Sequence, residues 1–274
     1  MNTLPYQLIA FDMDDTLLNS NRTISPQNIH WIHKLRTQGV QIVLCSGRPT
    51  VSLLRTAKEL LGENPGEYCI SFNGGAISQV HNGQEISRLP LPSEPGMEIL
   101  KIARNLGILL QAYEGDSFYV EKDDPRVHAY QKSINIGYEV LTDLSPIIQQ
   151  GSLKLLMNGP REALLRAQEQ LLPLANQGKV TMAFSKPEYL EFVHPQINKG
   201  TGLKLLCEHL GIPVGRTIGV GDSYNDRELI LQAGLGVAVA NAQNEIKEIA
   251  DLVLESTNNQ AIVQEIALKV FNLS

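Results

Sequence analysis

The sequence has little of what marks several classes of protein. Its three cysteines, Cys45, Cys69 and Cys207, are widely spaced and never form a CxxC pair, so neither a disulfide framework nor a zinc site is expected. No run of lysine or arginine exceeds two residues, and the net charge is −6. Nucleic-acid-binding proteins usually present a basic face, so this balance argues against that class.

Long apolar stretches are also absent. No segment approaches the length of a membrane span, and the first residues, MNTLPYQL, lack the charged start and apolar run of a signal peptide. The six histidines form no ligand cluster and no HExxH pattern, and GVGD (219–222) is not a GxGxxG fingerprint. These absences predict a cytoplasmic protein that binds neither nucleic acid nor membrane. They do not indicate an oligomeric state.

What is present is an alternation of strand and helix signals at both ends of the chain. The 274 residues are 43% hydrophobic, which suits one large globular domain or two modest ones. Apolar runs with helical connections imply βαβ units and a parallel sheet. Ser25 and Pro26 form a good helix start. Strands are expected at 8–11, 40–44, 68–72, 217–220, 237–239 and 252–254, and helices at 26–38, 51–61, 198–210, 224–233 and 260–270.

The middle of the chain has a different pattern. Polar and apolar residues alternate in LLQAYEGDSFYVE (109–121) and in VTMAFSKPEYLEFV (180–193). Each of these segments is predicted to form a strand pair with a turn. Helices near 94–106 and 161–175 precede them. We therefore expect a doubly wound α/β core, residues 1–83 plus 192–274, with an inserted α+β domain at 84–191. LPLPSEP (89–95) is a plausible linker.

Acidic residues follow the first strand directly. LIAFDMDDTLL (8–18) places Asp12, Asp14 and Asp15 where a buried strand ends. Crowded acids cost free energy at a water-poor site unless a cation joins them. Taken alone, the pattern also fits a solvated turn. Because ligands of parallel α/β sheets bind outside the carboxyl ends of the strands, the other strand ends decide between these interpretations.

Three further strand or helix ends carry complementary groups. Ser46 and Gly47 follow the second strand, where a hydroxyl and a backbone N–H can hold an anion, or simply cap a helix. Lys199 lies at a helix start, where the helix dipole disfavours a cation, in a turn that Gly200 and Gly202 weaken. A lysine aimed at a phosphate would explain that choice. Asp222 and Asp226 follow a later strand in GDSYND (221–226). Together, carboxylates for Mg²⁺ and a hydroxyl and a lysine for phosphoryl oxygens form one coherent set.

These segments, in this order, resemble the haloacid dehalogenase superfamily of phosphohydrolases. DMDDT (12–16) is similar to the first motif, Ser46 to the second, Lys199 to the third, and GDSYND to the fourth. The long insertion resembles the cap of the Cof-like branch, as do SFNGG (71–75) and INKGTGL (197–203). The commonest first motif has Gly where this chain has Asp15, so no catalytic role is assigned to that residue.

The resemblance implies a Mg²⁺-dependent phosphatase of small phosphomonoesters such as sugar phosphates. Asp12 would be the nucleophile that forms an aspartyl-phosphate, and Asp14 the general acid and base. The metal would be bound by Asp12, the backbone carbonyl of Asp14, Asp222 and, directly or through water, Asp226. The phosphoryl group would be held by Ser46, Lys199, Asn225 and the backbone N–H groups of Met13 and Gly47, with Asn73 and Arg48 as further candidates.

Two other functions fit the same sequence. A phosphomutase of the same superfamily would return the phosphoryl group to a sugar, and a catalytically silent sensor would bind a phosphorylated metabolite without releasing phosphate. The intact acidic motifs argue against the sensor. Isomerisation without phosphate release would identify the mutase.

Overall fold

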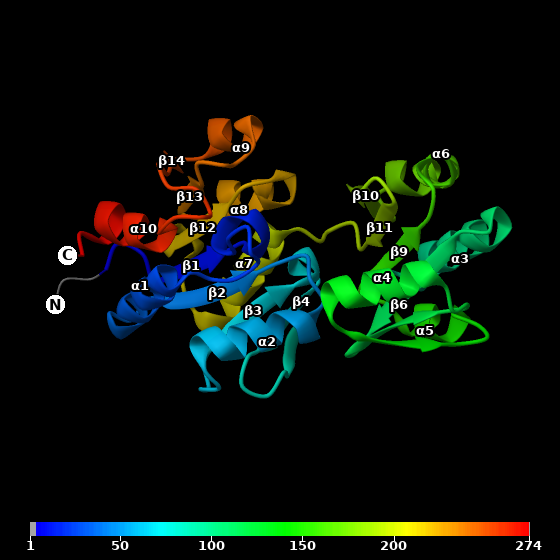
Figure 1. Ribbon diagram of the computed structural model, residues 1–274, viewed down its shortest axis with the longest axis horizontal. Helices are drawn as coiled ribbons and strands as arrows, with labels where there is room; N and C mark the ends of the chain where they lie inside the picture. The colour runs from blue at the N-terminus through cyan, green and yellow to red at the C-terminus, as the bar shows by residue number, and fades with distance from the viewer. Residues whose placement is uncertain (1–3, 274) are drawn as a thin grey trace. The chain divides into compact units, whose positions relative to one another are not determined.

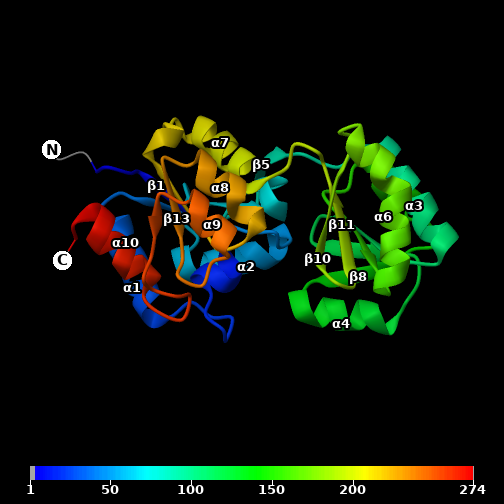
Figure 2. The ribbon, with the colours of Figure 1, turned by 90° about the horizontal axis from the view of Figure 1, so that it is seen from above.

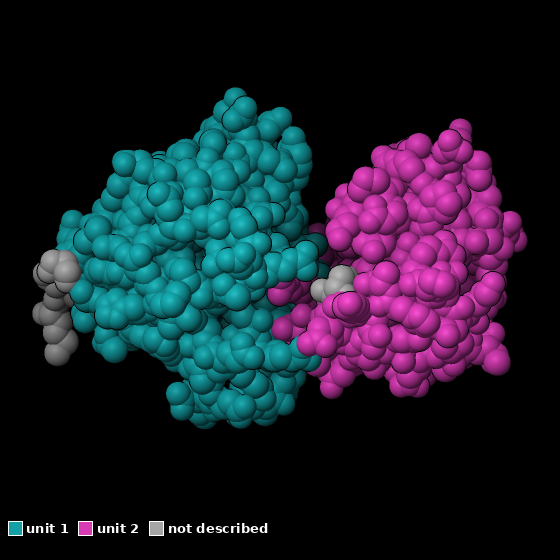
Figure 3. All heavy atoms as spheres, viewed as in Figure 1, with its two compact units in different colours: residues 1–47, 53–87, 198–274 teal, residues 48–52, 88–197 magenta. Residues whose placement is uncertain are grey.

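A computed structural model describes residues 4–273 of the chain. The chain divides into two compact units, coloured separately in Figure 3. Unit 1 comprises three segments: the chain up to Gly47, Leu53–Ser87, and the chain from Asn198. Unit 2 comprises Arg48–Ser52 and Arg88–Ile197. The boundary residues differ by a few positions from the domain limits inferred from the sequence, which stay a prediction.

Unit 1 is built on an eight-stranded sheet with the order β14-β13-β12-β1-β2-β3-β4-β5 (Figure 1). The six strands from β14 to β3 are parallel, whereas β4, which lies between β3 and the edge strand β5, runs antiparallel to β3. This antiparallel strand was not foreseen from the sequence. The strands are β1 (Leu8–Phe11), β2 (Gln41–Cys45), β3 (Tyr68–Ser71), β4 (Ala76–Gln79), β5 (Glu85–Arg88), β12 (Thr217–Gly221), β13 (Leu235–Ala238) and β14 (Leu252–Val253).

Apolar clusters cover both faces of this sheet, as expected for a doubly wound fold. One cluster packs Ile9 and Phe11 against helices α1 and α10, which lie side by side in Figures 1 and 2. The other packs Leu8 and Ala10 against α7 and α8. All four residues of β1 are therefore buried. The helices are α1 (Pro26–Thr37), α2 (Thr50–Leu61), α7 (Lys199–Leu210), α8 (Arg227–Gln232), α9 (Asn244–Ile249) and α10 (Ile262–Phe271), with short turns η1 (Met13–Leu17), η2 (Phe72–Gly74), η3 (Val214–Arg216) and η4 (Tyr224–Asp226).

The expected elements of unit 1 are found within a few residues of their predicted ends. Ser25 caps α1 by accepting a hydrogen bond from the backbone N–H of Asn28, and Pro26 is its first residue. The third strand is one residue shorter than predicted, because Phe72 turns into the left-handed region. The helix expected at 224–233 begins as the tighter turn η4.

Unit 2 has a six-stranded sheet with the order β10-β11-β9-β6-β7-β8. Both predicted strand pairs are confirmed, as antiparallel pairs β6–β7 and β10–β11. Elements α4, β8, α5 and β9 were not foreseen. The elements are α3 (Ser93–Leu106), β6 (Leu109–Glu114), β7 (Ser117–Val120), α4 (Pro125–Ile134), β8 (Gly137–Val140), α5 (Ser145–Gln150), β9 (Leu155–Asn158), α6 (Arg161–Asn176), β10 (Thr181–Lys186) and β11 (Tyr189–Val193).

The three cysteines are all free and buried. Among residues 4–273, no helix is long and apolar enough to cross a membrane.

Candidate active site

The central strand β1 places Asp12 between the ends of two neighbouring strands. Phe11 is in register with Val220 of β12 and with Leu44 of β2, and the backbone N–H of Asp12 donates to the carbonyl of Val220 at 2.9 Å. The residues that follow β1, β2 and β12 therefore start from one edge of the sheet. This is the edge where parallel α/β sheets bind ligands.

Three carboxylates meet at this edge. Each of Asp12, Asp222 and Asp226 offers one oxygen, and these oxygens all lie within 4.8 Å of one another. The three residues are 5%, 8% and 0% exposed, respectively. Buried carboxylates at such a separation repel one another, so they call for nearby positive charge. Hard oxygen donors in a cluster of this kind are suited to a divalent cation.

Lys199 supplies one positive charge. Its side chain is fully buried, its Nζ donates to Oδ1 of Asp226 at 2.5 Å, and it also forms an ion pair with Oδ1 of Asp12. The helix dipole disfavours a lysine at the first residue of α7, but two buried carboxylates outweigh that cost. With three carboxylates and one ammonium, the cluster carries a net formal charge of −2, which one divalent cation would balance.

The glycines beside Lys199 are required by close packing. A Cβ on Gly200 would lie 2.3 Å from the carbonyl oxygen of Glu228 in α8, and one on Gly202 would lie 2.7 Å from Ile70. Both distances are shorter than van der Waals contact. The first turn of α7 therefore packs with its backbone directly against neighbouring segments, which brings the lysine to the acids.

Burial shifts the ionisation of this cluster. Burial, with Asp226 and Asp222 close by, raises the pKa of Asp12 well above its usual range although Lys199 opposes the shift. Burial alone would lower the pKa of Lys199, but attraction to Asp12 and Asp226 outweighs it, so that pKa is raised and the amine stays charged. Burial also raises the pKa of Asp222 to about 6. Added positive charge would therefore stabilise the ionised acids.

The hydrogen bonds distinguish the roles of the acids. Asp226 uses Oδ2 to accept the backbone N–H groups of Asp222 and Ser223 at 3.0 and 3.1 Å, while Oδ1 accepts Lys199. Asp222 accepts the hydroxyl of Thr16 on Oδ1 at 2.8 Å. Among residues 4–273, no hydrogen bond is made to Oδ2 of Asp12 or Asp222. These two oxygens are thus available to a cation, whereas those of Asp226 are engaged.

The turn η1 carries the remaining acids of the first motif. Asp14 and Asp15 are exposed, whereas the side chain of Met13 is buried in the apolar cluster of α1 and α10. Asp15 has φ +60° and ψ 7°, in the left-handed region. Glycine occupies that region without a steric penalty, and aspartate tolerates it better than most residues. This conformation explains why position 15 suits either glycine or aspartate.

The turn after β2 is held by the turn after β3. Ser46 is 2% exposed and accepts the backbone N–H of Asn73 on its carbonyl at 2.9 Å. A Cβ on Gly47 would lie 3.0 Å from the amide nitrogen of Asn73, and Asn225 donates to Oδ1 of Asn73 at 3.4 Å. Four of the candidate phosphate-binding residues therefore lie together. Arg48, by contrast, belongs to unit 2.

Sequence reasoning missed two contributors to this site. Thr16 is fully buried and bonded to Asp222, yet only its place within DMDDT hinted at a role. Asn241 donates to the backbone carbonyl of Asp15 at 2.7 Å and so supports η1. No local pattern marks Asn241, because its partner is 226 residues away in the sequence.

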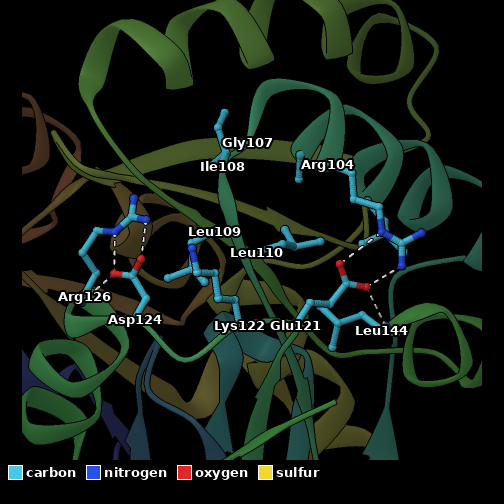
Figure 4. A pocket seen from close by; sticks show the side chains of 12 residues that line it. Arg104, Gly107, Ile108, Leu109, Leu110, Glu121, Lys122, Asp124, Arg126 and Leu144 are labelled. Atoms are coloured by element: carbon cyan, nitrogen blue, oxygen red, sulfur yellow. Dashed lines mark hydrogen bonds and ion pairs between the residues drawn. The ribbon is translucent and has the colours of Figure 1, made fainter. Parts of the chain in front are cut away.

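Unit 2 contains a cavity of about 270 Å³, shown in Figure 4. Leu109 and Leu110 lie between two ion-paired groups: Arg126 with Asp124 at 2.8 Å, and Arg104 with Glu121. These charges neutralise one another. The described residues that line the cavity include no cluster of buried carboxylates such as the one at Asp12, so the edge of the unit 1 sheet is the better candidate for catalysis.

Known proteins resemble this chain over most of its length. The model of the haloacid dehalogenase-like hydrolase family matches residues 9–266. A haloacid dehalogenase-like hydrolase from Bacteroides thetaiotaomicron is 32% identical in sequence, with a TM-score of 0.86 over 95% of this chain and 98% of that one.

Two curated relatives are named as phosphatases. The 5-amino-6-(5-phospho-D-ribitylamino)uracil phosphatase YitU of Bacillus subtilis is 26% identical over an alignment of 277 positions that covers 100% of both chains. The HMP-PP phosphatase of Serratia proteamaculans is 27% identical over 244 residues, 89% of this chain and 87% of its own. With the two-sheet fold and the acidic cluster, these matches show that the chain belongs to the haloacid dehalogenase-like hydrolases and is a Cof-like phosphatase of that family.

Proposed function

We propose that this phosphatase hydrolyses small phosphomonoesters, sugar phosphates or related metabolites, with Mg²⁺ and through an aspartyl-phosphate on Asp12. The observation that carries the proposal is the position of Asp12 at the carboxyl end of β1, in ion-pair contact with Lys199 and within 4.8 Å of Asp222 and Asp226.

Asp12 attacks phosphorus in the first step. A bond forms between a carboxylate oxygen and phosphorus as the bond from phosphorus to the leaving oxygen breaks. A carboxylate and a phosphate repel one another, and two unit negative charges do so by about 4 kcal/mol at 4 Å and an effective dielectric of 20. The buried ammonium of Lys199 offsets that repulsion where the two groups meet.

Asp14 moves the protons. Its side chain is exposed, two residues after the nucleophile, so it can exchange protons with a substrate or with water. It donates a proton to the leaving oxygen and then takes one from the water that attacks the aspartyl-phosphate. The bond between Asp12 and phosphorus breaks in that second step, and inorganic phosphate leaves.

The acidic cluster fits Mg²⁺ in charge and in ligand type. We assign direct contacts to Asp12 and Asp222, each with an unengaged Oδ2, and to the backbone carbonyl of Asp14. Both oxygens of Asp226 are engaged by Lys199 and backbone N–H groups. We therefore assign Asp226 the role of holding Lys199 and the loop of Asp222 in position. Bound there, Mg²⁺ supplies charge that stabilises the phosphoryl oxygens during transfer.

The phosphoryl oxygens are held by groups around the same edge. These are Lys199, the hydroxyl of Ser46, Asn225 and the backbone N–H groups of Met13 and Gly47. Arg48 is a candidate for contact with the rest of the substrate. The relatives' names support the substrate class, because the compound named for YitU is a phosphorylated ribityl derivative.

The direct test is phosphate release from a panel of phosphorylated metabolites with Mg²⁺. We expect turnover of several sugar phosphates, no turnover in chelator, and none with Asp12→Asn, while Asp116→Asn, a matched change at an exposed turn of unit 2, keeps full activity. Near-normal release by Asp12→Asn would refute the proposal. Isomerised sugar phosphate without free phosphate would identify a mutase, and binding without any turnover would identify a sensor.

A further inference from the structure

Three consecutive residues after β3 adopt left-handed backbone conformations. The φ angles are +49° for Phe72, +56° for Asn73 and +102° for Gly74. Glycine adopts such angles freely, but a bulky residue such as phenylalanine rarely does. Strained backbone of this kind persists only where the surroundings impose it, and it concentrates at functional sites. The surroundings of this turn therefore indicate what the strain achieves.

The first neighbour is the Ser46–Gly47 turn. The backbone N–H of Asn73 donates to the carbonyl of Ser46 at 2.9 Å. The side-chain amide of Asn73 fills the space beside Gly47, since a Cβ there would lie 3.0 to 3.3 Å from three of its atoms. Asn73 thus contacts both residues of the turn, one through its backbone and the other through its side chain.

The other neighbours are the loop after β12 and the start of α7. Oδ1 of Asn73 accepts the amide of Asn225, whose own Oδ1 accepts the hydroxyl of Ser223 at 2.6 Å. A Cβ on Gly74 would lie 2.3 Å from the carbonyl oxygen of Asn198, the residue that caps α7 ahead of Lys199. The left-handed turn therefore touches all three segments that we assign to phosphoryl binding beyond β1.

We propose that Asn73 is a positioning residue: it holds the Ser46–Gly47 turn against Asn225, so that the Ser46 hydroxyl is directed at the phosphoryl group. This inference rests on the proposed function. It assigns Asn73 an effect exerted through Ser46 in place of a contact of its own with the phosphoryl oxygens. A side chain that acts through another loses its effect when that other group is removed.

A double-mutant cycle tests the assignment. Asn73→Gly tolerates the left-handed backbone but removes the side-chain contacts. We expect it to lower kcat/KM for p-nitrophenyl phosphate by about tenfold or more. The same change in a Ser46→Ala background should cost less than about threefold. If Asn73→Gly lowers kcat/KM by the same factor in both backgrounds, the proposal is overturned, because the side chain would then act independently of Ser46.

Two controls separate positioning from stability and from the proposed function. Gly39→Ala strains a left-handed glycine (φ +89°) in open space at the opposite end of β2. It should lower the melting temperature without changing kcat/KM. Calorimetric affinity for inorganic phosphate, measured with Mg²⁺ in the same four proteins of the cycle, should show the same coupling. If phosphate binding is coupled across the cycle but the wild type shows no turnover, the proposed function is wrong and the positioning role stands. If phosphate binding is not coupled across the cycle, the positioning role is wrong.

Discussion

Thr16 donates its hydroxyl hydrogen to Oδ1 of Asp222 at 2.8 Å, across 206 positions of the sequence. Both side chains are buried. The bond connects the turn after β1 to the end of β12 and engages one of the two side-chain oxygens of Asp222. Thr16 thereby sets the orientation of a proposed metal ligand without contacting the metal.

Thr16→Val should therefore weaken the response to Mg²⁺. Valine keeps the shape but cannot donate a hydrogen bond, so Asp222 loses its orientation. Supporting residues of metal ligands typically contribute about 10-fold to 100-fold in affinity. Titration of phosphate release with Mg²⁺ measures the effect, and Thr16→Ser serves as the control that restores the hydroxyl. An unchanged Mg²⁺ requirement in the valine variant would show that the bond is only structural.

Lys199→Met should destabilise the metal-free protein by about 3–5 kcal/mol near neutral pH, because it leaves buried carboxylates unpaired. Lys204→Met, an exposed position on the same helix, should cost less than about 0.5 kcal/mol. Chemical denaturation measures both.

The loss in Lys199→Met should shrink at low pH. Burial already raises the pKa of Asp12 and Asp222. A carboxyl with a raised folded-state pKa favours folding below its unfolded pKa and loses that contribution as the pH rises through the folded value. Without the ammonium these values rise further. Equal destabilisation near pH 5 and pH 8 would contradict this account.

Asp15→Gly should keep full turnover, because Asp15 is exposed and we assign it no role in the chemistry. The left-handed conformation at φ +60° suits glycine and strains alanine. Asp15→Gly should consequently be more stable than Asp15→Ala by about 1 kcal/mol. Thermal unfolding of the two variants decides the point, and an alanine variant as stable as the glycine variant would show that the turn relaxes.

The affinity for Mg²⁺ should depend on pH in the range where Asp222 titrates. Its pKa is raised to about 6, and the metal requires the ionised form, so protons compete with Mg²⁺ below that value. The Mg²⁺ concentration for half-maximal activity should be constant above about pH 7 and rise by up to tenfold per pH unit below about pH 6. A constant requirement from pH 5 to pH 8 would argue against Asp222 as a ligand.

The sequence predicted the parts of the fold that local patterns encode. Buried runs such as Leu8–Phe11 and the Ser25–Pro26 helix start lie where they were expected. In unit 2, α4, β8, α5 and β9 escaped notice. Strand β8 is only four residues long and largely exposed, so it lacks the alternation that reveals a strand. It forms by parallel pairing with β7, and no local sequence pattern predicts that pairing.

The candidate site shows the same division. Carboxylates after β1 and β12 could be predicted to meet, because parallel strand ends share one edge. The contacts of Thr16, Asn73 and Asn241 could not, since each depends on a partner more than 25 residues away. Gly200 and Gly202 were noticed as weaknesses in a helix start. Their reason, contact of the α7 backbone with α8 and β3, is visible only in three dimensions.

Trapping the covalent intermediate tests the nucleophile most directly. The enzyme is mixed with a good substrate and Mg²⁺, quenched in acid within milliseconds, digested and analysed by mass spectrometry. We predict one phosphoryl group on the peptide that contains Asp12, carried by Asp12 and lost on mild alkaline treatment. A phosphoryl group on any other residue, or single-turnover transfer to water with no labelled Asp12 at any quench time, would contradict the account.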